Sequence, residues 1–203
     1  MKDKRNNSAG EKAHATDKPL PSEQDKAIRL VKRAIGGDFT AFGNLYGIYL
    51  DRIYRYVFYQ VKDKMTAEDI TEEVFLKAWK AINSCKGKEQ TFSSWLYRIA
   101  HNRVIDIFRS QRKERTVEME TVAELNQPAV EIETELDHQE ILNNLTDLPP
   151  NQRQVIILKF IEGLDNQEIG RIIGKSQGAI RVLQTRALAK LREKLNSGHE
   201  NER

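Results

Sequence analysis

Several features that would assign a protein to a special class are missing from this chain of 203 residues. It has one cysteine, Cys85, which excludes an intramolecular disulfide framework, and its four histidines lack the spacing of a zinc site. No segment reaches the roughly 18 apolar residues of a membrane span, and the polar N-terminus lacks the apolar stretch of a signal peptide. We therefore expect a cytoplasmic globular protein without a metal or cofactor.

Charge is unevenly distributed along the chain, although the net charge is only +3. Between Arg98 and Arg115 there are six Lys or Arg residues and two acids, and between Arg181 and Lys194 there are five and one. The segment Glu114–Glu140 holds nine acids and a single Arg. Two basic blocks separated by an acidic one indicate two modules that face DNA and a connector that faces something else.

The segment 164–195 has the pattern of two helices joined by a tight turn. Asp165 can cap the first helix, and Glu168 can complete a capping box with it. Gly174 suits a left-handed turn position, and Ser176 is placed to cap the second helix. The pattern predicts a helix-turn-helix, whose second helix can lie in the major groove of DNA.

The second of these helices is expected to be apolar on one side and largely basic elsewhere. Its inward positions are Ile180, Leu183, Ala187, Leu191 and Leu195. Its other faces carry Gln177, Arg181, Gln184, Thr185, Arg186, Lys190 and Arg192. The same stretch also allows two other interpretations: a packed helical hairpin with a solvated basic face, and a phosphate-binding loop at residues 170–176. That loop has one residue too few between its glycines and lacks a preceding strand.

The N-terminal half is expected to form amphipathic helices after a polar, disordered tail at residues 1–21. Ser22 can cap a first helix that ends at Gly36–Gly37, and Asp38 begins a second. The aromatic residues of the second helix follow helical spacing, so we expect most of them in a core rather than on a base-stacking surface.

A third helix is unusual for the acids on its outward face. Thr66 with Asp69 is expected to form the capping box that opens it. Its inward residues are Ile70, Val74, Ala78 and Ile82, and its first turns carry Glu68, Asp69, Glu72 and Glu73. The helix dipole alone can account for acids at these positions. The alternative is an acidic docking face for a basic partner.

A polar loop at residues 83–91 precedes a fourth helix, which is expected to run from Phe92 to about Arg109. Its polar residues are Arg98, His101, Asn102, Arg103, Asp106 and Arg109. Cations among aromatic and aliphatic residues are suited to holding phosphates while an exposed base is stacked or enclosed. An ordinary basic helix would carry the same residue types, so this pattern alone does not distinguish a nucleic-acid site from such a helix.

Four sequence blocks together resemble one family. They are DFTAFxxLY at 38–46, AEDITEEVFLKAW at 67–79, FSSWLYRIAHNRVID at 92–106 and LPPNQRQVIILKFIEGL at 148–164. The first three resemble region 2 of bacterial sigma factors of the extracytoplasmic-function (ECF) group of the sigma-70 family. The fourth, with the helix-turn-helix after it, resembles region 4. The resemblance covers about residues 27–195, in the expected order and with the expected linker.

This resemblance implies an all-α protein of two small helical domains, which binds RNA polymerase core and directs promoter-specific initiation without being an enzyme. The implied core-binding residues are Asp69, Glu72 and Glu73. Those implied for the melted downstream element, called minus-ten, are Arg98, Asn102, Arg103 and Arg109. Those implied for the upstream element, called minus-thirty-five, are Gln177, Arg181, Val182, Thr185 and Arg186. The family also suggests an anti-sigma factor as an inhibitory partner.

The expected domains are region 2 at residues 22–113 and region 4 at 137–196, joined by an acidic extended linker at 114–136 and followed by a tail at 197–203. Such factors often have Thr, Ser and Arg where this chain has Ala179, Val182 and Leu183, and often Arg where Leu188 stands. These departures leave the preferred bases open. Two other functions fit the residues: a dimeric helix-turn-helix regulator that binds duplex DNA without polymerase, and a protein adaptor that uses the acidic helix.

Overall fold

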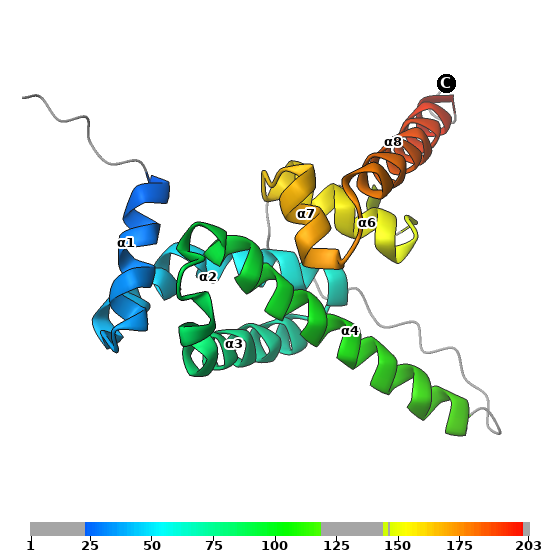
Figure 1. Cartoon of the computed structure of the whole chain (residues 1–203). Coiled ribbons are helices and arrows are strands. Elements are labelled where there is room, and N and C mark those ends of the chain that lie inside the picture. Colours follow the sequence, from blue (N-terminus) through cyan, green and yellow to red (C-terminus); the bar gives the residue numbers. More distant parts are fainter. Residues whose placement is uncertain (1–22, 119–143, 146, 201–203) are drawn as a thin grey trace, which may run out of the picture.

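The computed structural model describes residues 23–118, 144–145 and 147–200. Every regular element in these ranges is helical (Figure 1), which confirms the all-α prediction. None of the helices within them is long and apolar enough to cross a membrane. The predicted tail at 1–21, most of the predicted linker and the first residues of the predicted region 4 domain lie outside the described residues.

The N-terminal unit is a bundle in which consecutive helices pack on one another. Its helices are α1 (Glu23–Ile35), α2 (Phe39–Val61), α3 (Lys64–Ala81) and α4 (Phe92–Glu118). The contacts run from α1 to α2, from α2 to α3 and from α3 to α4, and α2 also touches α4. The predicted start of the second helix at Asp38 is confirmed to within one residue, and Asp38 is its N-cap: its carboxylate accepts a hydrogen bond of 3.0 Å from the backbone N–H of Ala41.

Two predictions for this unit were wrong in detail. Thr66 and Asp69 do not open α3, because Asp63 caps it one turn earlier and accepts a 2.7 Å bond from the Thr66 N–H. The fourth helix does not end near Arg109 but continues to Glu118, since no Gly or Pro interrupts it. The loop at 83–91 contains two short 3-10 turns, η1 (Ile82–Cys85) and η2 (Glu89–Thr91), and the Cys85 side chain is buried.

The C-terminal unit has the predicted helix-turn-helix. Its elements are α6 (Pro150–Ile156), the π-helical turn η3 (Ile157–Ile161), α7 (Asn166–Ile173) and α8 (Gln177–Glu200). Asp165 and Glu168 form the capping box in both directions, and Gly174 has the left-handed φ of 69°. Ser176 caps α8 by accepting from the Ala179 N–H at 3.2 Å. The backbone of α8 stays helical to Glu200, beyond the end predicted near Asn196.

Two glycines explain why this stretch resembles a phosphate-binding loop. A Cβ atom at Gly170 would lie 2.6 Å from the backbone oxygen of Lys175, so only glycine lets the turn fold back onto α7. Gly174 supplies the left-handed residue of the same turn. Both glycines therefore serve the helix-turn-helix, and a helix rather than a strand precedes the loop.

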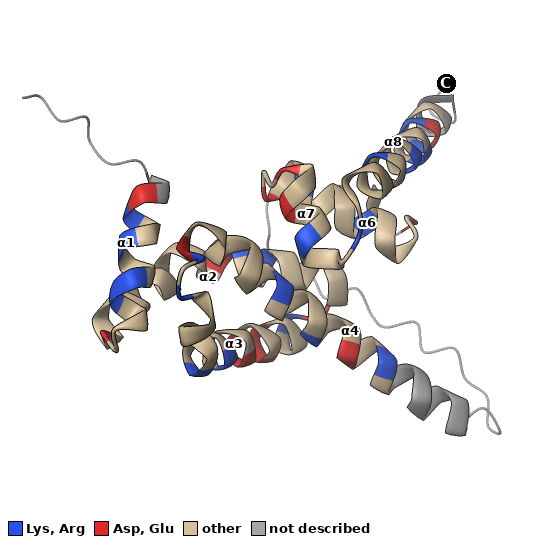
Figure 2. Ribbon diagram, viewed as in Figure 1, with Lys and Arg blue, Asp and Glu red and all other residues tan. Residues whose placement is uncertain are grey.

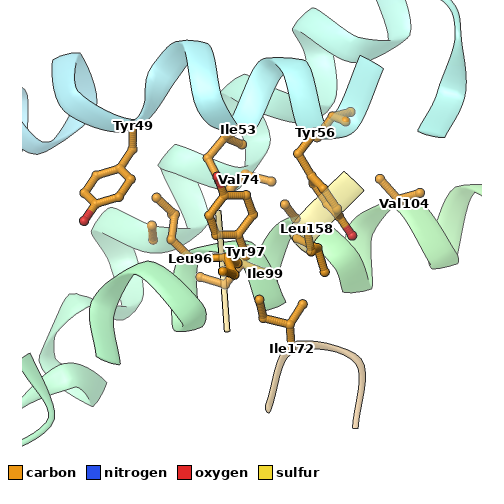
Figure 3. Close-up of a cluster of buried hydrophobic side chains, with 14 of the residues drawn as sticks. Tyr49, Ile53, Tyr56, Val74, Leu96, Tyr97, Ile99, Val104, Leu158 and Ile172 are labelled. Carbon is orange, nitrogen blue, oxygen red and sulfur yellow. The ribbon is translucent and has the colours of Figure 1, made fainter. Parts of the chain in front are cut away.

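The buried side chains of the two units form one cluster. Figure 3 shows aromatic and aliphatic residues of α2, α3 and α4 together with Leu158 of η3 and Ile172 of α7. Most aromatic residues of α2 lie in this core, as predicted; the exceptions are Phe39, which is 72% exposed, and Tyr46, which is 37% exposed. The C-terminal unit is thus docked on the N-terminal one, and α7 packs against α4.

Candidate nucleic-acid interface

The second helix of the helix-turn-helix, α8, presents a polar face to solvent. Gln177, Arg181, Val182, Thr185 and Arg186 are all exposed, which places the five predicted residues on the surface of one helix. Its opposite side is anchored by α6 and α7, where Ile180 and Ala187 are fully buried and Leu183 and Leu191 are partly buried. The predicted packing of Leu195 lies outside the described side chains.

The chemistry of this face suits the edges of base pairs. Two guanidinium groups, those of Arg181 and Arg186, can each bond two acceptors on a guanine or hold phosphates. Val182 is 49% exposed and can contact a thymine methyl group. The Thr185 hydroxyl donates to the Arg181 carbonyl at 3.0 Å, which leaves its oxygen free to accept.

The predicted downstream residues lie along α4 but do not have equal freedom. Arg98, Asn102 and Arg109 are exposed, and within the described ranges the Asn102 amide makes no hydrogen bond. Arg103 is half-buried and donates two hydrogen bonds to Glu73 of α3, one of them at 2.9 Å through Nη2. The bond to Glu73 is also the main reason that the pKa of Arg103 is raised. Arg103, which was predicted to contact DNA, is therefore paired with Glu73, which was predicted to contact the polymerase.

The acidic face of α3 is where the sequence placed it. Asp69, Glu72 and Glu73 are exposed, and the buried Ile70 and Val74 hold the opposite side of the helix in the core. Figure 2 shows the acidic positions along α3 and the basic positions along α8. The two surfaces thus carry opposite charge and belong to different units.

Beside the acids lies a hollow that the sequence did not reveal. It has a volume of about 280 Å³ between α2 and α3, and its lining includes Tyr46, Leu50, Tyr54, Glu68 and Glu72. Tyr46 lines the hollow and is 37% exposed, although most aromatic residues of this helix were predicted to lie in the core. Helical spacing identifies the apolar side of a helix but does not show where two helices diverge.

Known proteins match both units. Residues 45–114 match the family model of sigma-70 region 2, and residues 145–193 match that of sigma-70 region 4. The chain is 33% identical to the ECF RNA polymerase sigma factor SigW of Bacillus subtilis over 184 residues, which cover 84% of the chain and 95% of SigW. The chain belongs to the ECF group of the sigma-70 family.

Two further relatives support this membership. The ECF sigma factor BldN of Streptomyces coelicolor is 37% identical over 174 residues; the match covers 84% of this chain but only 66% of BldN. The solved sigma factor RpoE of Bartonella quintana, in complex with the anti-sigma factor NepR, has a TM-score of 0.65 at 24% identity. That match covers 76% of this chain and 96% of RpoE, and it shows a shared fold.

Family membership decides the class of function. A sigma factor directs promoter-specific initiation of transcription by RNA polymerase and is not an enzyme, so the same holds for this chain. The helices described above are therefore the N-terminal region 2 unit and the C-terminal region 4 unit of an ECF sigma factor.

Proposed function

We propose that this sigma factor divides its work among three surfaces, on α3, α4 and α8. We assign residues 22–113 to region 2 and 137–196 to region 4, with the acidic segment 114–136 as their linker. Residues 1–21 and 197–203 are assigned as tails. The observation that carries this division is the exposure of every residue assigned to these three surfaces except Arg103, which is half-buried and paired with Glu73.

The upstream element is assigned to α8. Arg181 and Arg186 supply two guanidinium groups, each of which can form two hydrogen bonds with a guanine. The rest of the face consists of Gln177, Val182 and Thr185. The helix-turn-helix supports this, because its turn geometry fixes α8 against α6 and α7 while leaving this face in solvent.

The downstream element is assigned to α4 and to the loop before it. Asn102 offers both a donor and an acceptor to an unstacked base, while Arg98, Arg103 and Arg109 follow the phosphates. Extruding a base costs a few kcal/mol, which these contacts must offset. The exposed, unbonded amide of Asn102 supports this assignment within the described residues.

The polymerase core is assigned to the acidic face of α3. Asp69, Glu72 and Glu73 offer carboxylates on neighbouring turns to a basic partner. The hollow beside Glu72 adds apolar surface from Tyr46 and Leu50, which an aliphatic side chain of the partner can fill. We further propose that the protein acts in the cytoplasm and is regulated by an anti-sigma factor, since the similar RpoE of Bartonella quintana forms a complex with one.

Reconstitution with purified core polymerase tests this assignment. Transcript starts should cluster at a fixed distance from a shared pair of sequence elements, and the variant Asp69→Lys/Glu72→Lys should bind core less tightly. Asp25→Lys, on the exposed surface of α1, is the matched charge reversal and should bind like the parent. A palindromic duplex site bound tightly without polymerase, with no stimulation of core, would instead indicate a dimeric regulator.

A further inference from the structure

One face of α1 carries positive charge that none of the three assigned surfaces uses. Its exposed cations are spaced three residues apart and are therefore neighbours on the helix: Lys26, Arg29 and Lys32. Figure 2 shows Lys and Arg positions along α1. Within the described ranges these three side chains make no ion pair, whereas the adjacent Arg33 is paired with Asp38. We call Lys26, Arg29 and Lys32 the α1 cations.

The stability of the helix does not account for the α1 cations. The helix dipole favours Lys32, which lies in the last turn. Lys26, however, lies in the first turn, where the dipole disfavours a cation, and Arg29 lies in the middle of the helix. Like charges on neighbouring turns also repel each other, which destabilises a helix. An external anion would remove this repulsion, so the arrangement favours a binding role.

The packing of α1 fixes this face next to the loop at 83–91. α1 contacts α2 and both 3-10 turns of the loop, η1 and η2. Ala27, Val31 and Ala34 are buried on its packed side. The α1 cations therefore lie on the outer side of a helix that is held against the loop.

The loop itself adds two exposed lysines, Lys86 and Lys88. Its one acid, Glu89, accepts a hydrogen bond of 3.1 Å from the Gly87 N–H. Hydrogen bonds from the backbone N–H groups of Glu89 and Gly87 are the main causes that lower the pKa of Glu89, and the nearby Lys32 of α1 lowers it further. The carboxylate is thus engaged inside the loop, while in the described part of the chain neither Lys86 nor Lys88 has an ion-pair partner.

The loop leads directly into the α4 face that we assign to the melted element. α4 begins at Phe92 after η2, and Arg98 and Asn102 lie one turn apart on its exposed face. By helix rise, Asn102 lies about 15 Å from the start of α4, and the α1 cations span about 9 Å. Exposed cations therefore continue from Arg98 across the loop to α1.

We propose that the α1 cations, together with Lys86 and Lys88, bind the phosphates of the melted DNA strand where it leaves the base held by Asn102. The proposal rests on the assignment of the downstream element to α4 and the loop. A single strand fits better than a duplex, because a base at Asn102 has already left the stack and the nucleotides beside it are unpaired. α1 has no aromatic residue to stack a base, so the contact is to phosphate and does not depend on sequence.

The first test measures the charge of this contact. Holoenzyme is bound to a pre-melted promoter fragment that contains the downstream element but lacks the upstream one, and fluorescence anisotropy gives its affinity over a range of salt concentrations. Lys26→Gln/Arg29→Gln/Lys32→Gln should bind at least about fivefold less tightly at low salt. Each lost contact to a single-strand phosphate should lower the slope of log K against log salt by about 0.7, which is about 2 for the triple variant.

Two further variants control for this effect. Lys175→Gln/Lys190→Gln/Arg192→Gln removes three exposed cations of region 4 and should bind the fragment like the parent. Asp25→Lys adds a cation to the exposed face of α1 and should bind it more tightly. Thermal unfolding checks that each variant is folded.

The second test locates the contact. A photo-crosslinking amino acid in place of Arg29 should react with the melted strand, within a few nucleotides of the base that Asn102 holds and on one side of it. Extending the strand on that side by about ten nucleotides, a usual length for a single-strand binding site, should tighten binding of the parent. The same extension should tighten binding of the α1 triple variant less.

The possible results separate this contact from the proposed function. If the parent does not initiate with core polymerase, the proposed function fails and the contact at α1 fails with it. If the parent initiates and the α1 triple variant keeps the affinity and salt slope of the parent, the contact at α1 alone is overturned. Weaker binding of the triple variant to core polymerase, or cross-links from position 29 to a polymerase subunit instead of DNA, would show that α1 faces an acidic protein surface and would also overturn it.

Discussion

The two helices that we propose face DNA, α4 and α8, differ in how much of the molecule surrounds them. α8 is supported on one side, by α6 and α7, and in the described part of the chain neither Arg181 nor Arg186 has an ion-pair partner. α4 is contacted by α2, α3 and α7, and its Arg103 is already paired with Glu73. The face of α8 proposed for the upstream element can therefore act as an independent module, whereas the face of α4 proposed for the downstream element is connected to α3, the proposed polymerase-binding helix, and to region 4.

Among changes to the helix-turn-helix, the largest loss of stability is expected from a change in the turn before α8 rather than from the removal of a DNA contact. Gly170→Ala places a methyl group where only 2.6 Å separates it from the Lys175 carbonyl, so the turn must deform. We expect a loss of unfolding free energy in the upper part of about 1–3 kcal/mol, together with weaker binding of upstream duplex. Thermal unfolding measures the first effect and fluorescence anisotropy the second.

Gly178→Ala is the matched control for this change. A Cβ at Gly178 would have only the Ser176 hydroxyl at 4.0 Å, so alanine should raise stability by up to about 1 kcal/mol through helix propensity. Equal stability of the two alanine variants would mean that the turn adapts and that the contact at Gly170 is unimportant.

Direct base reading by α8 is tested next. Arg181→Ala should weaken binding to the preferred upstream duplex by about 1–3 kcal/mol if the guanidinium pairs with a guanine, and it should relax the preference at that position alone. A phosphate contact would lower binding to all sequences alike. Site selection with the variant measures the difference, and Lys190→Ala, exposed on the same helix, is the control. Unchanged affinity would remove Arg181 from the interface.

The helix-turn-helix could be predicted almost residue by residue. Asp165, Glu168, Gly174 and Ser176 act locally, within one turn of the backbone they cap, so their types and spacing carry the full signal. The acidic and basic surface positions were also predictable, because charged residues opposite the apolar stripe of a helix face solvent. Their assignment to particular partners stays a prediction.

Contacts that depend on tertiary structure could not be predicted in the same way. Asp63 was overlooked as the cap of α3 because the Thr66 and Asp69 spacing also fits a capping box, and only the backbone distinguishes them. The sequence did not indicate that the Glu162 side chain is buried, because an acid before a glycine is typical of an exposed helix end. Its hydrogen-bond partners Tyr97 and Arg52 are 65 and 110 residues away in the sequence, and the π-helical turn η3 brings Glu162 to them.

The variant Asn102→Ala tests the face of α4 that is proposed to bind the downstream element. Loss of amide hydrogen bonds to an exposed base, each about 0.5–1.5 kcal/mol, should reduce open complex roughly three- to tenfold while core binding stays normal. Permanganate reactivity of the downstream thymines measures opening. A pre-melted promoter should recover part of the loss if the defect is in strand opening, and none if Asn102 chiefly contacts the exposed base. Normal reactivity and normal transcription from duplex would exclude Asn102.

The smallest effect is expected where the two region 2 surfaces meet, at the ion pair of Glu73 and Arg103. The side chains are 50% and 38% exposed, so solvent screens the pair and its contribution to unfolding free energy should stay under about 1 kcal/mol. Glu73→Arg and Arg103→Glu should therefore change the melting temperature little, and the double charge swap should restore it. The matched swap is Asp147→Lys/Lys194→Asp, which inverts an exposed ion pair of region 4.

Transcription should respond differently from stability. If Glu73 faces the polymerase and Arg103 faces DNA phosphate, each charge is read by a separate external partner, and the Glu73→Arg/Arg103→Glu swap reverses both. Initiation with core polymerase should then stay low in the double variant even though its ion pair is restored, while the Asp147/Lys194 swap initiates like the parent. Recovery of initiation by the Glu73/Arg103 swap would show that the pair only braces α3 against α4. In that case the downstream helix would be as independent of the polymerase-facing surface as α8 is.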